Sequence, residues 1–169
     1  ECNTAYPGER NTTDAHRRTM IKHGWSKLFD VDILDAEGPD LELPIPNGKR
    51  IQKNLVGKDI KNYDSMLVLS HFKGHPMGGF GGALKQLSIG CASSAGKANI
   101  HGAGKPEEMW TTEQNAFLES MADAAESVVK LFDGKIVYIN VMKNMSVDCD
   151  CCAVAEDPCM KDIGILASL

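Results

Sequence analysis

Imidazole and amine side chains are concentrated in one stretch of the sequence, residues 65–106. This stretch contains no Asp or Glu, although the whole chain has 23 acidic residues. A neutral imidazole accepts or donates a proton near neutral pH, which makes histidine the commonest general acid or base. The candidate catalytic residues are therefore the three histidines of the stretch, His71, His75 and His101.

The same stretch has the composition of an anion-binding site, because it combines lysines with many of the chain's glycines. Glycine N–H groups and positive side chains can approach a carboxylate or phosphate closely when no negative charge competes. The alternative is a glycine-rich connector with solvated lysines, since neither the P-loop nor the dinucleotide-binding pattern is present. The candidate residues for binding a small anionic ligand are Lys73, Gly81, Gly82, Lys85, Ser93, Ser94 and Lys97.

Four of the six cysteines lie close together in "DCDCCAVAEDPC". Cysteine thiolates bind zinc and iron-sulfur clusters, although this spacing is neither that of a zinc ribbon nor that of a ferredoxin. Redox-active thiols and buried packing are the alternatives. The candidate ligands for an iron-sulfur cluster or zinc are Cys149, Cys151, Cys152 and Cys159.

The elements that must position these residues can be predicted from the hydrophobic pattern. Apolar runs at residues 31–35, 65–70, 135–141 and 162–168 predict strands, and residues 13–23 and 111–132 predict helices. The second helix has a stripe of Phe117, Met121, Ala124, Val128 and Phe132, which we expect to face the core. Strands that alternate with helices predict an α/β fold with a mostly parallel sheet flanked by helices. Ligands bind beyond the carboxyl ends of such strands.

Two further features concern the organisation of the chain. Asn47-Gly48 separates two apolar runs and predicts a β-hairpin over residues 41–56, appended to the main sheet. The length of 169 residues suits a single α/β domain, residues 1–169.

Charge and hydropathy argue against several classes of partner. The net charge of -5 disfavours nucleic acid, and no apolar run approaches the ~20 residues that span a membrane. Reduced thiols and the lack of a visible secretory signal predict a cytoplasmic protein. The sequence is also compatible with a homo-oligomer.

The segments "SMLVLSHFKGHPMGGFGGALKQLSIGCASSAGKANIH", "VYINVMKNMSVDCDC" and "DIGILASL" closely resemble a family of prokaryotic uncharacterised iron-sulfur centre proteins, a domain of unknown function. The resemblance covers nearly the whole chain. It implies an iron-sulfur site at the cysteine cluster and a chain that is a piece of a longer protein. More weakly, "GGALKQLSIGCASSAGKANIH" is similar to a pattern of the lactate racemase family, which would place Lys85 and His101 at substrate or cofactor positions.

Three functions follow from these observations. The first is a metal- or iron-sulfur-binding protein with redox activity and an anion-binding cleft. The second is a metal-free isomerase or racemase of a small carboxylic acid. The third is a module that binds an anionic metabolite without catalysis.

Overall fold

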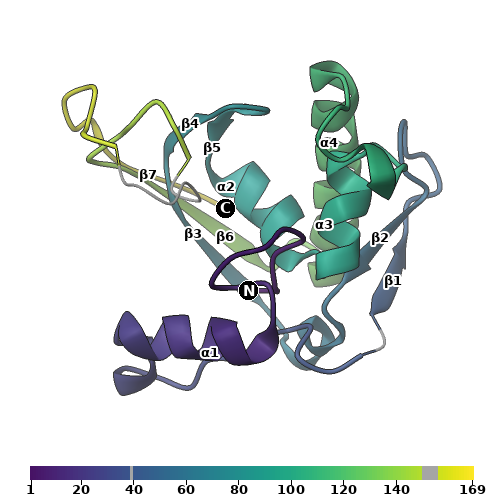
Figure 1. Cartoon of the computed structure of the whole chain (residues 1–169), viewed down its shortest axis with the longest axis horizontal. Coiled ribbons are helices and arrows are strands. Elements are labelled where there is room, and N and C mark those ends of the chain that lie inside the picture. The colour runs from purple at the N-terminus through teal and green to yellow at the C-terminus, as the bar shows by residue number, and fades with distance from the viewer. Residues whose placement is uncertain (39, 150–155) are drawn as a thin grey trace.

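The computed structural model of the chain describes residues 1–38, 40–149 and 156–169 (Figure 1). Its α-helices within these residues are α1 (Thr13–Lys22), α2 (Ala83–Lys85), α3 (Ser94–His101) and α4 (Gln114–Phe132). Its strands are β1 (Leu41–Pro44), β2 (Lys53–Val56), β3 (Met66–His71), β4 (Lys73–His75), β5 (Gly79–Gly81), β6 (Ile136–Met142) and β7 (Gly164–Ser168). A π-helical turn, Gln86–Gly90, continues α2, and short 3-10 helices occupy Trp25–Lys27, Lys58–Asn62 and Pro106–Glu108.

The prediction of a mostly parallel sheet is wrong. The strands form three small sheets, in the orders β1-β2, β3-β6-β7 and β4-β5, and β3-β6 is the one parallel pair among the described residues. Parallel pairing needs a long crossover, which α2, α3 and α4 supply between β3 and β6. The connection from β6 to β7 contains no helix in its described part, and β7 returns antiparallel to β6. The correct description is a mixed α/β fold whose strand pairs are mostly antiparallel.

Local pattern misled the prediction at residues 31–35 and gave no sign of two short strands in the glycine-rich segment. Residues 31–35 form no strand, although their alternation is typical of one. The glycine-rich segment, by contrast, contains β4 and β5, which pair antiparallel and return the chain toward α2. Strand formation here depends on neighbours more than on the intrinsic preference of the residues.

Helix α4 lies across the centre of the molecule, between the β3-β6-β7 sheet and the β1-β2 ribbon (Figure 1). Its predicted stripe is confirmed, because Phe117, Met121, Ala124, Val128 and Phe132 are all buried. The helix begins two residues later than a cap at Thr111 would require, since the carboxylate of Glu113 caps it by accepting a hydrogen bond from Ala116 N at 3.0 Å. It ends at Phe132, and the next residue, Asp133, caps it in a left-handed conformation.

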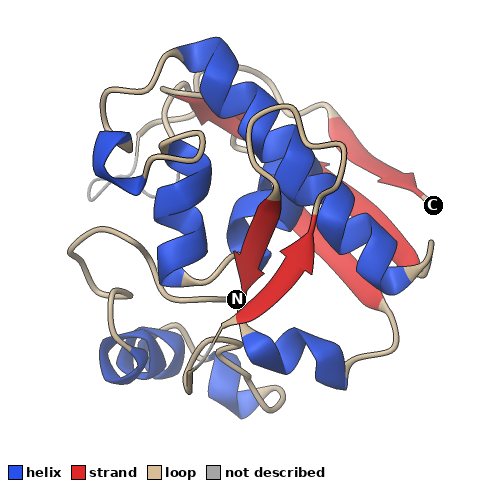
Figure 2. Cartoon of the chain, turned by 90° about the vertical axis from the view of Figure 1, so that its right-hand side faces the viewer, coloured by secondary structure: helices blue, strands red, loops and turns tan. Residues whose placement is uncertain are grey.

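The β1-β2 ribbon lies in front of α4 when the molecule is seen from its right-hand side (Figure 2). A carboxylate on α4 fixes its turn: Asp123 accepts hydrogen bonds from the backbone N–H groups of Lys49 at 3.0 Å, Arg50 at 2.7 Å and Ile51 at 3.1 Å. Strands β1 and β2 pair antiparallel on either side of Asn47-Gly48, where the sequence predicts a hairpin.

Helix α3 packs closely on β2, which matters because α3 supplies two residues of the site. Ser93 N donates a hydrogen bond to Leu55 O at 2.9 Å, immediately before the helix. A Cβ atom at Gly96 would lie only 2.0 Å from Leu55 O, so this approach requires glycine. The backbone of β2 therefore sets the position of α3.

Among the described residues, every helix is too short or too polar to cross a membrane.

Candidate functional site

A pocket of about 260 Å³ brings together four of the predicted site residues. Its walls come from the N-terminal segment (residues 1–10), the end of β4, α2 with its π-turn, and α3. The predicted residues that line it are His75, Lys85, Lys97 and His101. Two of these side chains offer imidazole nitrogens and two offer amines, so the pocket combines proton-transfer groups with positive charge.

Lys85 is placed in the pocket by the start of α2. Gly82 precedes the helix, and a Cβ there would lie 2.9 Å from Asn140 Oδ1, which in turn accepts a hydrogen bond from Ala83 N at 2.9 Å. This contact ties the helix start to β6. The π-turn that follows also borders the pocket, through Gln86 and Ile89. Such turns are uncommon and are often found at functional sites.

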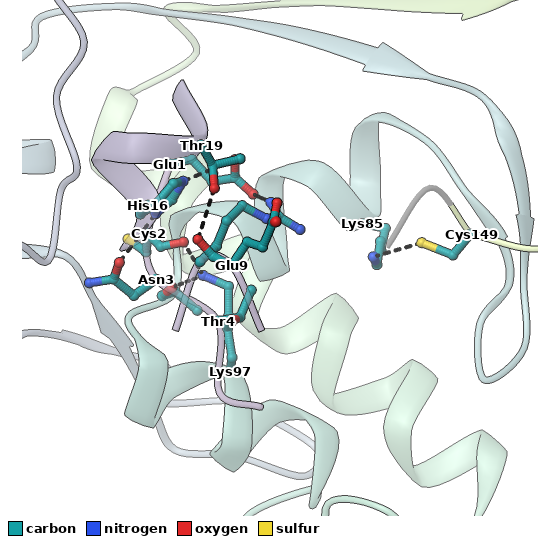
Figure 3. Close-up of polar contacts among 12 residues, drawn as sticks. Glu1, Cys2, Asn3, Thr4, Glu9, His16, Thr19, Lys85, Lys97 and Cys149 are labelled. Atoms are coloured by element: carbon teal, nitrogen blue, oxygen red, sulfur yellow. Dashed lines mark hydrogen bonds and ion pairs between the residues drawn. The ribbon is translucent and has the colours of Figure 1, made fainter. Parts of the chain in front are cut away.

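The Lys85 ammonium has a single, long contact within the described residues, a hydrogen bond of 3.8 Å to Cys149 Sγ (Figure 3). It therefore keeps hydrogen-bonding capacity for a ligand. An ammonium in a partly enclosed pocket attracts carboxylate and phosphate groups.

His75 is held in one tautomer by the backbone. Its Nδ1 accepts a hydrogen bond from Gly78 N at 2.9 Å, so the proton of the neutral ring must be on Nε2. The side chain is 7% exposed, and burial followed by the charge of Lys85 lowers the pKa of His75 from 6.5 to about 4. His75 is therefore neutral at pH 7 and presents an N–H donor.

His101 is held in the opposite tautomer. Its Nδ1 lies 2.7 Å from Lys97 O, and because a carbonyl oxygen can only accept, Nδ1 must carry the proton. Burial lowers the pKa of His101, although the bond to Lys97 O opposes this shift. The neutral ring leaves an unprotonated Nε2. The ring also stacks on Phe117, with centroids 4.9 Å apart, which fixes its orientation.

Lys97 is the most enclosed charged side chain of the pocket, with 5% of its surface exposed. Its Nζ donates hydrogen bonds to Ala92 O at 2.6 Å and to Cys2 O at 3.2 Å. The second bond joins α3 to the N-terminal segment (Figure 3). Burial lowers the pKa of Lys97.

A larger cleft of about 1080 Å³ adjoins the pocket, and the two share six lining residues: Glu1, Thr4, Tyr6, Arg10, Lys85 and Gln86. Lys73 and Cys149 line this cleft opposite residues of α1. Lys73 Nζ donates a hydrogen bond to His71 O at 3.0 Å, and its side chain packs beside Gly81, where a Cβ would lie 3.4 Å from Lys73 Cε. Lys73 therefore belongs to the larger cleft, whereas Gly81 packs beside Lys73 without lining the cleft or the pocket.

Three other predicted residues lie outside the pocket lining and have structural contacts. His71 Nε2 donates a hydrogen bond to Lys143 O at 2.7 Å. Ser93 caps α3 by accepting a hydrogen bond from Gly96 N at 3.1 Å, and it donates to Asp40 Oδ2 at 2.6 Å. Ser94 Oγ donates to Thr4 O at 3.1 Å. The two serines therefore hold α3 and the N-terminal segment in place.

Two of the four predicted metal ligands, Cys149 and Cys159, lie within the described residues. Cys151 and Cys152 lie outside the described residues. Cys149 is buried beside Lys85, whereas Cys159 is exposed and its Sγ donates a hydrogen bond to Met145 O at 3.3 Å. Within residues 1–38, 40–149 and 156–169, no three His, Cys, Asp or Glu side chains are grouped so that they could hold a metal ion.

Sequence reasoning missed the residues that close the pocket from the N-terminal side. Arg10 lines the pocket and forms an ion pair of 2.8 Å with Glu1, which also lines it. Tyr6 and Trp110 form an aromatic pair at its rim, with ring centroids 6.0 Å apart. The first ten residues have no periodic pattern, and Trp110 precedes a helix, so no local signal marked these residues.

The chain was compared with protein families, curated proteins and solved structures. The family model described as "Domain of unknown function (DUF362)" matches residues 1–169. The searches of curated proteins and of solved structures gave no significant match. The family description assigns neither an activity nor a cofactor.

Proposed function

The chain belongs to the DUF362 family over residues 1–169, and from this premise we propose that it is an isomerase that moves a proton on a small carboxylic acid bearing a carbonyl group. In this proposal His101 is the general base and the neutral His75 is the hydrogen-bond donor to the carbonyl oxygen. Lys85 binds the carboxylate.

The observation that carries the proposal is the opposite tautomers of the two pocket histidines. Backbone contacts leave Nε2 of His75 as a donor and Nε2 of His101 as an acceptor. Enolisation needs both groups, since a base removes the proton next to the carbonyl while a donor stabilises the oxygen that becomes negative. Both rings border the same pocket, and both are kept neutral by burial.

The charge of the pocket supports an acidic substrate. Arg10 and Glu1 neutralise one another across their 2.8 Å ion pair, and Lys85 adds a positive charge without a nearby carboxylate partner among the described residues. A pocket of about 260 Å³ has room for a small carboxylic acid. A small carboxylate fits both its charge and its size.

Proton exchange with solvent tests the proposal directly. Pyruvate incubated with the protein in D2O should lose its methyl proton signal in a 1H NMR spectrum, and His101→Gln should slow this exchange by about 10²–10⁴-fold, the usual contribution of a general base. His23→Gln is the matched control, because His23 is exposed at the end of α1 and lines the larger cleft but not the pocket that holds His75 and His101. Binding of pyruvate without exchange would replace the isomerase with a binding module. Exchange that is equal in the wild type and in His101→Gln would refute the assignment of the base.

A second candidate function is a metal or iron-sulfur centre at Cys149, Cys151, Cys152 and Cys159. The contact of Cys149 Sγ with Lys85 Nζ at 3.8 Å favours it, because a neighbouring ammonium stabilises the thiolate that metals bind. Elemental analysis and an absorption spectrum of protein purified without oxygen or chelator test this candidate. Stoichiometric iron or zinc that disappears in Cys149→Ser/Cys151→Ser would support it, and metal at background level in the wild type would exclude it.

A further inference from the structure

Lys97 occupies a position that its contacts explain only in part. The side chain lines the pocket and donates hydrogen bonds to two backbone carbonyl oxygens, Ala92 O at 2.6 Å and Cys2 O at 3.2 Å. Figure 3 shows Lys97 beside Cys2. It is 5% exposed, so it is largely removed from water. An amine in this setting is unusual, because lysine is almost never fully buried without a negatively charged partner.

The number of hydrogen-bond partners favours a neutral amine over an ammonium. An ammonium has three N–H donors, and within the described part of the chain its Nζ has only the two carbonyl partners. The third donor has no acceptor among the described protein groups, so it would have to point toward the pocket. A neutral amine has two N–H groups, and both are then satisfied. Its lone pair is directed away from the two carbonyl groups.

The charges around Lys97 come from several elements. Glu1 and Cys2 face it from the N-terminal segment, Asp35 from the loop before β1, and Cys91 from the end of the π-turn. Each of these groups raises the pKa of Lys97 when it is ionised, but burial is the larger effect and the pKa is lowered. The physical setting is the one in which lysine acts as a nucleophile, namely a desolvated amine inside a pocket.

We propose that Lys97 is a nucleophile that forms an imine with the carbonyl carbon of a small oxo acid bound in the pocket. The amine nitrogen attacks the carbonyl carbon and forms a C–N bond, which gives a carbinolamine. The carbonyl oxygen then leaves as water and takes with it the two hydrogens that were on the amine. The step needs no oxidant or reductant. The inference rests on the proposed function only for the class of ligand, because it adds a covalent step that does not require His101 to be the base.

A purely structural role is the competing explanation, since Lys97 also joins α3 to the N-terminal segment. An arginine or a neutral hydrogen-bond donor could form the same bridge, but neither could form an imine. The two roles therefore differ in chemistry, and a trapping experiment separates them.

The test is reductive trapping with pyruvate. The wild-type protein is incubated with pyruvate and sodium borohydride, and the product is digested and mapped by mass spectrometry. We expect one reduced adduct per chain, located at Lys97, with labelling there above that of an exposed lysine, because the lowered pKa of Lys97 enlarges the fraction of the reactive neutral amine. Lactate, which has the same carboxylate and no ketone, is the control ligand and should give no adduct.

Two variants complete the design. Lys97→Arg should abolish the specific adduct, and Lys61→Arg, at an exposed site that lines neither the pocket nor the larger cleft, should leave it unchanged. Labelling spread evenly over exposed lysines, or no adduct in the wild type, would overturn the inference. Because this result comes from the wild-type protein alone, it is decisive even if Lys97→Arg folds poorly. An adduct at Lys97 without proton exchange would refute the isomerase proposal and support the imine at Lys97. Proton exchange that depends on His101 and persists in Lys97→Arg, together with no adduct in the wild type, would support the isomerase proposal and refute the imine at Lys97.

Discussion

The close approach of α3 to β2 gives a prediction that can be worked out in detail. In Gly96→Ala the new Cβ would lie 2.0 Å from Leu55 O, whereas ordinary contacts begin at 3.4 Å, so α3 would have to move away by about 1.4 Å. Such a shift would break the 2.9 Å hydrogen bond from Ser93 N to Leu55 O and loosen the packing of Ala92 and Ile100, both fully buried.

The expected magnitude follows from opposing effects. Alanine is favoured over glycine in a helix by about 1 kcal/mol. Against this gain, the buried hydrogen bond is worth about 1 kcal/mol and the displaced packing about 1–3 kcal/mol. We therefore expect Gly96→Ala to lower the free energy of unfolding by about 1–3 kcal/mol, at an unchanged denaturant m-value.

Urea unfolding followed by circular dichroism measures this change. Gly38→Ala is the matched control, because a Cβ at Gly38 meets no atom within 4 Å, and it should be neutral or stabilising by up to about 1 kcal/mol. Because Lys97 directly follows Gly96, the variant should also reduce labelling of Lys97 by pyruvate. A Gly96→Ala protein as stable as Gly38→Ala would refute the argument that β2 fixes the position of α3.

Three other predictions concern stability. Asp123→Ala removes the acceptor of three backbone N–H groups and should destabilise the protein by about 2–4 kcal/mol in urea unfolding, with Asp123→Asn intermediate; equal stability of all three would contradict the role of the carboxylate. The pKa of His75 is about 4 in the folded protein and 6.5 unfolded, so the unfolded state binds more protons between these values and stability is lost as the pH falls. From pH 7 to 5 the wild type should lose about 2 kcal/mol more than His75→Gln, and parallel losses in both would show that His75 is not the cause. Ser93→Ala removes the cap of α3 and should lower the free energy of unfolding by about 1–2 kcal/mol; an unchanged melting curve would argue against the cap.

The parts of the fold that local pattern determines could be predicted from the sequence. The stripe of α4 was clear because five apolar residues recur at helical spacing, and all five are buried. The apolar runs at β3 and β6 are likewise strands. The direction of β7 could not be predicted, because an apolar run has the same pattern whether its neighbour is parallel or antiparallel.

The candidate site was predictable to a similar extent. Residue type and charge distribution indicated His75, Lys85, Lys97 and His101, and these line one pocket. The tautomers of the histidines depend on Gly78 N and Lys97 O, and backbone contacts of this kind leave no trace in residue type. Arg10 and Glu1 were missed because they reach the pocket through a segment without periodic pattern.

Residues 1–10 form one wall of the pocket, so the pocket is complete only when this segment has docked during folding. That wall is attached by contacts between residues far apart in the chain, such as Lys97 Nζ with Cys2 O, 95 positions away, and Ser94 Oγ with Thr4 O, 90 positions away. Loop closure over such separations is entropically unfavourable, so these contacts form late in folding. Cys2 is fully buried in the same core cluster as Val128 of α4, whereas residues 5–10 are half-buried or exposed and can open locally while that core stays intact. Residues 5–10 are then the part of the wall that can detach from the pocket, and amide exchange there should be faster than in α4.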